Sequence, residues 1–187
     1  MFYNLKLTNH APRILVLSAL LLSTFSTFSH VVLEEPVALA GSSYKAALRV
    51  GHGCEGSPTT AITVQLPSGF LGAKPQPKPG WLLSVKRESL AQPYLSHGKQ
   101  VTQDVTEITW TAATKDSWLP DAFFDEFVLR GSLPAKAQAM WFKVLQTCEK
   151  GRLEWNQIPS SGVSTRGLKS PAALLELIAS DHVGHQH

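Results

Sequence analysis

Short runs in which apolar and polar residues alternate dominate the middle of the chain. Residues 43–50 (SYKAALRV) place Tyr44, Ala46, Leu48 and Val50 on one side. The same alternation recurs in three further runs, AITVQL (61–66), VTEITW (105–110) and MWFKVL (140–145). A period of two over such short runs predicts half-buried β-strands.

The segments between these runs are rich in proline and glycine, which break helices and favour turns. They include HGCEGSP (52–58), KPQPKPGW (74–81) and SLPAKAQ (132–138). Half-buried sheets must cover each other's apolar faces, so we expect an all-β fold. The expected architecture is an antiparallel, immunoglobulin-like β-sandwich of about seven to nine strands with Greek-key connections.

The C-terminal part of the chain has a different pattern. Residues 159–170 are rich in Ser, Gly and basic side chains and are typical of a linker. The following PAALLELIAS (171–180) could form two turns of helix, and DHVGHQH (181–187) closes the chain. We therefore predict one folded domain over residues 30–159 and a linker with a flexible, His-containing tail over 160–187.

The N-terminal segment has the layout of a secretory signal peptide. Lys6 and Arg13 precede an apolar run over residues 14–22, which is too short for a membrane span of about 20 residues. Small residues at Thr27 and Ser29 predict cleavage after Ser29, so that His30 becomes the first residue of the mature chain. The alternatives are an uncleaved N-terminal anchor and cleavage a few residues away, for example after Ser26.

Removal of residues 1–29 leaves a nearly neutral protein. The mature chain keeps 15 of the 17 basic residues against 14 acidic ones. This balance gives no reason to expect nucleic acid or acidic membranes as partners, and no remaining segment is apolar enough to span a membrane. About 158 residues are enough for one domain with a core. We expect an exported, periplasmic protein.

The two cysteines, Cys54 and Cys148, lie far apart in the sequence. In an oxidising compartment a disulfide is the default, and closing a loop of nearly 100 residues contributes roughly 4–5 kcal/mol. The alternative is a metal site with two thiolate ligands, although the chain lacks the CxxC spacing common in such sites.

An N-terminal His30 would offer its α-amine and its imidazole Nδ1 to the same metal ion. Such a chelating pair of nitrogens suits Cu(II), which prefers nitrogen and oxygen donors in a square arrangement. Glu34 and Glu35 are poor candidates for a further ligand, because an extended chain would place them roughly 13–16 Å away.

A second carboxylate pair lies in FFDEFVLRG (123–131). Strand alternation places Glu126 on the same face as Phe124 and Val128, and Asp125 on the other face. Either both acids lie in water on a curved or edge strand, or Glu126 is a metal ligand on a partly apolar face. Trp155, in GRLEWNQIP, would by the same reasoning be an ordinary core or rim aromatic residue.

The assembled pattern resembles the YcnI-like copper-binding family of exported bacterial proteins. The resemblance rests on the N-terminal His after a signal peptide and on HGCEGSPTT, KPGW, FFDEFVLRGSLP and VLQTCEKGRLEWNQIP, and it covers residues 30–159. It implies a β-sandwich that binds Cu(II) through a brace built on a single histidine. It implies that His30 gives the amine and imidazole, that Glu126 gives a carboxylate and that Trp155 lies beside the ion.

The resemblance also bears on Cys54 and Cys148, since HGC and QTC match the disulfide-containing members of the family. The indole of Trp155 would shield the metal and interact with its charge, an effect of about 0.5–2 kcal/mol. The partners implied are the copper ion and, beyond it, other periplasmic copper chaperones or transporters.

The remaining histidines have simpler interpretations. His52 lies in a Gly-rich turn and His97 in YLSHGKQ, and both are expected to be loop residues. His182, His185 and His187 could bind metal loosely, or could be a solvated end of the chain.

Two functional classes remain. The protein either holds Cu(II) for trafficking and homeostasis, or uses the same N-terminal histidine for oxygenase-like chemistry. Copper oxygenases add a second histidine to the brace, whereas a carboxylate donor favours Cu(II) over Cu(I). We therefore expect a non-enzymatic carrier; a metal-free adhesion or scaffold sandwich is the third alternative. No catalytic triad, paired-carboxylate motif or phosphate loop is present in the sequence.

Overall fold

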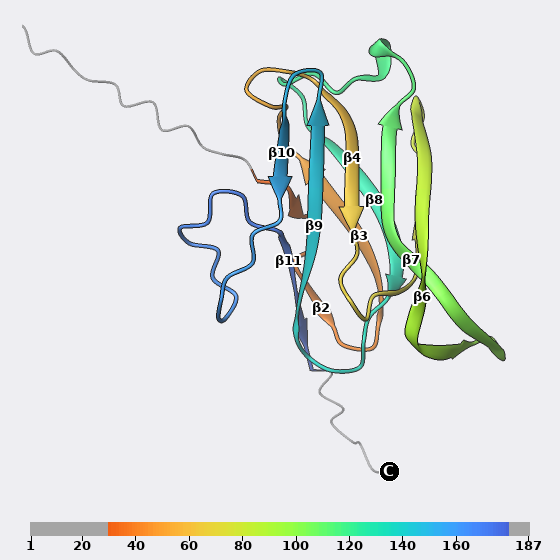
Figure 1. Ribbon diagram of the computed structural model, residues 1–187. Helices are drawn as coiled ribbons and strands as arrows, with labels where there is room; N and C mark the ends of the chain where they lie inside the picture. The colour runs from red at the N-terminus through yellow and green to blue at the C-terminus, as the bar shows by residue number, and fades with distance from the viewer. Residues whose placement is uncertain (1–29, 180–187) are drawn as a thin grey trace, which may run out of the picture.

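Alternating buried and exposed positions divide the chain into two facing sheets, seen in the computed structural model, which describes residues 30–179 (Figure 1). The first sheet has four strands in the order β1 (Val32–Leu33), β3 (Ser43–Val50), β8 (Asp125–Ser132) and β5 (Leu71–Pro75). The second has seven strands. Six follow the order β2 (Val37–Leu39), β11 (Ala173–Ile178), β9 (Ala139–Cys148), β4 (Thr59–Gln65), β7 (Lys99–Ala112) and β6 (Trp81–Ser96).

The seventh strand, β10 (Arg152–Trp155), shares one edge of β9 with β11. It pairs with the Val144–Thr147 part of β9, whereas β11 pairs with the Ala139–Phe142 part. All strand pairs are antiparallel except β11 with β2, which are parallel. The prediction of an all-β sandwich is confirmed, although the described residues form eleven strands rather than the expected seven to nine.

The core lies between the sheets and is built from the inward positions of both. The four apolar residues predicted to share one side of residues 43–50 are all buried. Trp110 and Phe127, from opposite sheets, are fully buried with ring centroids 5.7 Å apart. Aromatic pairs in this edge-on arrangement add about 0.5–1.5 kcal/mol beyond the burial of their area.

The predicted disulfide is present. Cys54, in the loop after β3, is bonded to Cys148 at the end of β9. Both cysteines are oxidised, so the alternative of a two-thiolate metal site is wrong. The disulfide joins the loop that follows a strand of the first sheet to a strand of the second.

The predicted helix at residues 171–180 is wrong, because this segment forms β11. Ala173, Leu175 and Leu177 are buried while Glu176 and Ile178 are exposed, which is the period of a strand. An isolated helix this short is marginal in water, whereas the edge of β9 offers backbone partners for a strand. The folded domain thus extends to Ile178 rather than ending at residue 159.

The predicted linker, residues 160–170, contains no strand or helix. The chain segments at its two ends are joined by backbone hydrogen bonds. The backbone N–H groups of Asn156 and Gln157 both donate to the carbonyl oxygen of Ser170. The segment is therefore a surface loop between β10 and β11. The predicted signal peptide (1–29) and the tail histidines His182, His185 and His187 lie outside the described residues.

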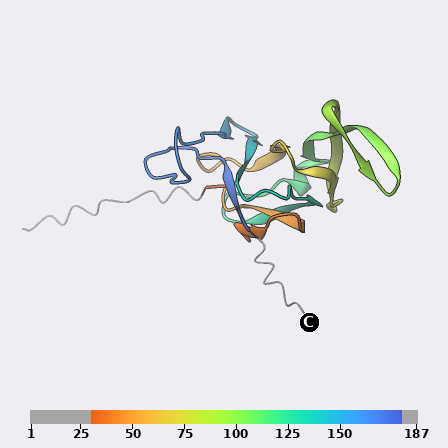
Figure 2. The same cartoon turned by 90° about the horizontal axis from the view of Figure 1, so that it is seen from below.

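Strands β6 and β7 form a long hairpin whose outer part bends away from the sandwich (Figure 2). His97 and Gly98 form its two-residue turn, both with positive φ (48° and 75°), as such hairpin turns require. His97 is thus a turn residue, as predicted.

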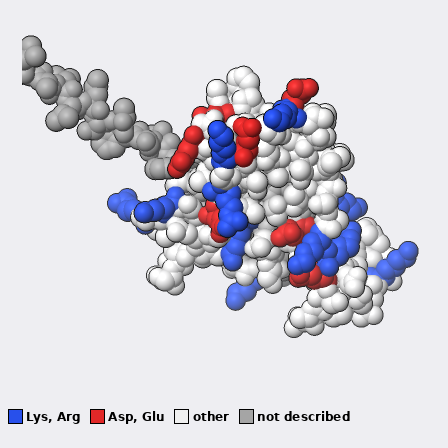
Figure 3. Space-filling model, turned by 45° about the horizontal axis from the view of Figure 1, so that its top comes forward, with Lys and Arg blue, Asp and Glu red and all other residues white. Residues whose placement is uncertain are grey.

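The charged side chains do not form a surface of one sign on the face shown in Figure 3, where basic and acidic groups are mixed. Between residues 30 and 179, no helix has the length and apolar character needed to cross a membrane. The only helical segment there is a three-residue 3-10 turn, Lys115–Ser117.

Candidate metal centre

Trp155 ends β10 and is only 1% exposed, because its position in the strand alternation points into the core. Its indole Nε1–H donates a hydrogen bond to Oε1 of Gln146 at 3.0 Å. Gln146 occupies an inward position on β9, the neighbouring strand. The orientation of the indole ring is therefore fixed by a specific polar contact as well as by packing.

Gln146 is a polar side chain at a core position and is itself 1% exposed. Its Nε2 donates to the backbone oxygen of His52 at 2.6 Å and to Oγ1 of Thr59 at 2.8 Å. With Oε1 accepting from Trp155, the amide uses both its donors and one acceptor, as a buried amide must. Gln146 links the indole of Trp155 to the loop that carries His52.

His30 lies two residues before the start of β1 and is half-buried against Trp155. The centroids of the two rings are 5.7 Å apart with an interplanar angle of 56°. β1 pairs with β3 through Val32↔Arg49 and Leu33↔Leu48. If that register continues, His30 falls opposite Gly51. The structure brings His30 and Trp155 together, as the resemblance implies, and metal binding by them stays a prediction.

His52 lies against the same indole. Its ring centroid is 6.4 Å from that of Trp155 and the rings are nearly perpendicular, at 76°. Nδ1 of His52 is 2.5 Å from the backbone oxygen of Gly53. A carbonyl oxygen can only accept, so this contact selects the neutral tautomer with the proton on Nδ1 and the lone pair on Nε2.

Gly53 allows the chain to fold tightly beside His52. A Cβ atom at this position would lie 2.0 Å from the backbone oxygen of Ser57 and 3.2 Å from Oδ1 of Asp121, so only glycine fits. The backbone N–H of Gly53 donates to the same Asp121 oxygen at 2.9 Å. This loop is held from several sides, unlike an ordinary solvated turn.

The pairing of β8 with β3 and of β3 with β1 fixes the position of Glu126 in the first sheet. It pairs with Arg49, which pairs with Val32, so these three residues form a row across β8, β3 and β1. The Cα atoms of Glu126 and Val32 are two strand spacings apart, roughly 10 Å. Within residues 30–179, no hydrogen bond or ion pair joins the Glu126 carboxylate to His30, and Glu126 remains a ligand by resemblance alone.

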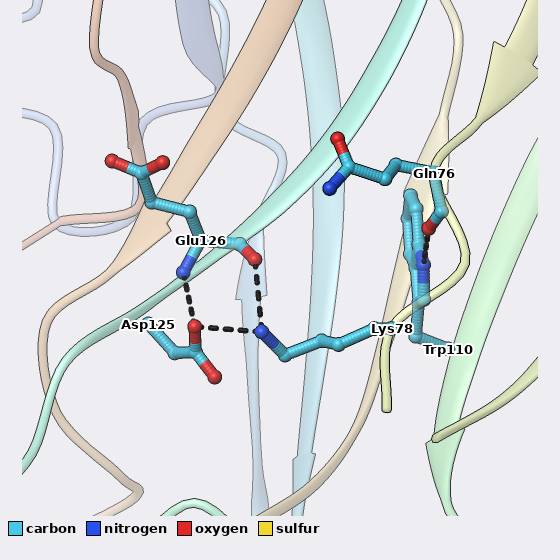
Figure 4. Close-up of polar contacts among 5 residues, drawn as sticks. All are labelled: Gln76, Lys78, Trp110, Asp125 and Glu126. Atoms are coloured by element: carbon cyan, nitrogen blue, oxygen red, sulfur yellow. Dashed lines mark hydrogen bonds and ion pairs between the residues drawn. The ribbon is translucent and has the colours of Figure 1, made fainter. Parts of the chain in front are cut away.

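The neighbouring acid, Asp125, has a structural partner. Its Oδ1 lies 2.7 Å from Nζ of Lys78 and also accepts the backbone N–H of Glu126 at 2.8 Å (Figure 4). Lys78 donates in addition to the backbone oxygen of Glu126 at 3.3 Å, and lies over the ring of Phe127. The carboxylate of Glu126 points away from this cluster in Figure 4.

The described part of the chain contains no group of three or more His, Cys, Asp or Glu side chains arranged to hold a metal ion. What it does contain is two half-buried imidazoles, those of His30 and His52, on one buried indole. His52 lies in a loop, as the sequence predicts, but its contact with Trp155 and the role of Gln146 were not predicted. A glutamine at an inward position of the run MWFKVLQTC was the available signal.

Comparison with known proteins gives one family match. A model described as "Domain of unknown function (DUF1775)" matches residues 30–177. Its range begins at His30 and includes β11. No protein with a curated description matches the chain.

Solved structures with a similar fold include an uncharacterized protein from Nocardia farcinica described as immunoglobulin-like. It is 28% identical over 81% of this chain and 99% of its own, with a TM-score of 0.61. Two cohesins are more distant. The one from Pseudobacteroides cellulosolvens is 9% identical (84% and 97% covered, TM-score 0.42), and the one from Archaeoglobus fulgidus is 8% identical (84% and 98%, TM-score 0.37). The likeness to the first structure supports the immunoglobulin-like description of this sandwich.

Proposed function

The chain belongs to the DUF1775 family, and from that premise we propose that it is an exported, YcnI-like protein that binds Cu(II) through its N-terminal histidine. After cleavage behind Ser29, the α-amine and Nδ1 of His30 would form a chelate on one copper ion. The observation that carries the proposal is the contact of His30 with the buried indole of Trp155.

The chemistry of the two residues supports copper in particular. Amine and imidazole nitrogens suit Cu(II), which stands at the top of the affinity order of divalent ions. The α-amine has an ordinary pKa of about 8, so a competing metal ion displaces its proton at modest cost near neutral pH. The indole of Trp155, held by Gln146, limits the access of water on one side of His30.

Two further observations support an exported location. The disulfide between Cys54 and Cys148 is the form that persists in oxidising compartments such as the periplasm. The family match also starts at His30, the residue that cleavage would make terminal. The role we propose is copper trafficking or homeostasis, in which copper is exchanged with other periplasmic chaperones or transporters.

Quenching of tryptophan emission tests the proposed location of the metal. Cu(II) should strongly quench the emission of a chain that begins at His30, and Trp155→Phe should remove most of that quenching. Trp110→Phe is the matched control, because Trp110 is equally buried but lies elsewhere in the core. Quenching that survives in Trp155→Phe and disappears in Trp110→Phe would exclude the proposed position of the metal.

A second candidate function is favoured by one observation, the position of His52 on the same indole. Copper oxygenases use two histidines, so a site with His30 and His52 would resemble theirs in its donors. Reductant-dependent oxidation of a polysaccharide by the copper-loaded protein separates the two functions. A copper carrier should give no more oxidised polysaccharide than the same amount of free copper gives.

A further inference from the structure

We propose that Nε2 of His52 is a further nitrogen donor to the copper ion held by His30. The inference rests on the proposed function, since it concerns the same metal ion. It adds a ligand that neither the resemblance nor the family description assigns, and it replaces the carboxylate of Glu126 in that role.

The hydrogen bond of His52 leaves the correct nitrogen free. Nδ1 lies within hydrogen-bond distance of the carbonyl oxygen of Gly53, so the neutral tautomer that fits this contact has its lone pair on Nε2. Histidines that bind metals commonly donate their other ring N–H to a carboxylate or a backbone carbonyl, which fixes both the tautomer and the ring orientation. His52 makes a hydrogen bond of this kind, from Nδ1 to the backbone carbonyl of Gly53.

The backbone that carries His52 is held in place on both sides. Its carbonyl oxygen accepts from the buried Gln146, and the next residue but one, Cys54, is bonded to Cys148. Gly53 is fixed by Asp121 and cannot be replaced without a clash. A ligand on such a backbone loses little conformational entropy when the metal binds.

His30 and His52 both lie against the indole of Trp155, at ring-centroid distances of 5.7 and 6.4 Å. The β1–β3 pairing includes Val32↔Arg49, and if that register continued for two more residues His30 would fall opposite Gly51, the residue before His52. Residues directly opposite in an antiparallel pair have Cα atoms about 4.5–5.5 Å apart. The proposal requires that rotation about the side-chain bonds of His30 brings its nitrogens toward the His52 ring.

The simplest competing explanation is that His52 only packs against Trp155. Edge-to-face packing needs an aromatic ring but no nitrogen lone pair. His52→Phe keeps the packing and removes the donor, and so separates the two explanations. Glu126→Gln tests the rival donor, and His97→Ala, in the hairpin turn, removes an imidazole from a different part of the molecule.

The experiment uses chains that begin at His30, loaded with one equivalent of Cu(II). Competition with a chelator of known affinity measures binding, and electron spin echo modulation counts the coordinated imidazoles. We expect two imidazoles in the parent protein. His52→Phe should show one imidazole and should bind Cu(II) about 10- to 100-fold more weakly. Loss of a residue that only orients a metal ligand already weakens binding by this much, so loss of a ligand should do no less. Glu126→Gln and His97→Ala should be unchanged.

A single imidazole in the parent protein would overturn the proposal, and this measurement does not depend on the folding of any variant. So would a folded His52→Phe with unchanged affinity, or a loss confined to Glu126→Gln. Failure of the parent protein to bind Cu(II) at all would instead contradict the proposed function, so the two failures are distinguishable.

Discussion

Gln146 is the residue on which the geometry of the candidate site depends. It is buried, and its side chain contacts Trp155, His52 and Thr59 at once. A buried polar group that loses its partner carries the full cost of its desolvation, about 1–3 kcal/mol. A change at Gln146 therefore affects both the stability of the fold and the positions of two aromatic rings.

Gln146→Leu keeps the side-chain volume but leaves Trp155 Nε1–H and the His52 carbonyl unpaired. We expect the free energy of unfolding to fall by about 1–3 kcal/mol for each group, measured by urea denaturation. Gln146→Glu is the comparison, because its carboxylate still accepts from Trp155 but, while ionised, faces the His52 carbonyl oxygen with no proton to donate. Its loss should be at least as large as that of Gln146→Leu, since a buried charge carries an additional desolvation cost. Equal stability of all three proteins would show that the contacts contribute nothing.

Tyr44 gives the fold a pH dependence at the alkaline end. Its hydroxyl donates to the backbone oxygen of Glu35, and burial, followed by the charge of Glu35, raises the pKa of Tyr44 to about 12 from its ordinary value of 10. The folded state therefore favours the neutral phenol. Its contribution is fully present below pH 10 and is lost as the pH rises toward 12.

Between pH 10 and 12, this linkage should cost the parent protein roughly 2–3 kcal/mol of unfolding free energy. Tyr44→Phe cannot ionise, so its stability should fall less steeply over the same interval. Denaturation at a series of pH values compares the two slopes. Parallel curves would mean that Tyr44 titrates normally in the folded protein.

At the scale of the elements, the alternation of apolar and polar residues predicted most strands correctly. It failed for the segment whose structure depends on pairing with a strand distant in sequence. Residues 43–50 and 140–145 alternate strictly, and both lie in strands of the sandwich. The segment 171–180 (PAALLELIAS) contains good helix formers, yet residues 173–178 pair with the edge of β9 and form β11. That edge arises only once β9 is folded, so a local reading of the sequence misses it.

The inward side chains of β11 are buried and form part of the hydrophobic core. Leu175→Ala removes a fully buried side chain and should lower the free energy of unfolding by about 2–5 kcal/mol. Ile178→Ala, in the same strand but half exposed, should change it by no more than about 0.5 kcal/mol. Similar small effects at both positions would contradict the assignment of residues 173–178 to the folded domain.

At the scale of the whole molecule, the disulfide and the two sheets bring together parts of the chain that are distant in sequence. His30 and His52 both lie against Trp155, although more than 100 residues separate His30 from Trp155 in the sequence. The sequence singled out His30 through the predicted cleavage site and the chelate that a terminal histidine offers, and Trp155 only through resemblance. The position of His52 depends on the conformation of a loop, which the alternation of apolar and polar residues does not predict.

The central claim is that cleavage creates the copper ligand by freeing the α-amine of His30. The most direct measurement compares the Cu(II) affinity of a chain that begins at His30 with that of a chain carrying one additional residue before it. The extra residue turns the amine into an amide, and we expect binding to weaken by at least about a hundredfold, since the chelate is lost. Equal affinity of the two chains would contradict the account.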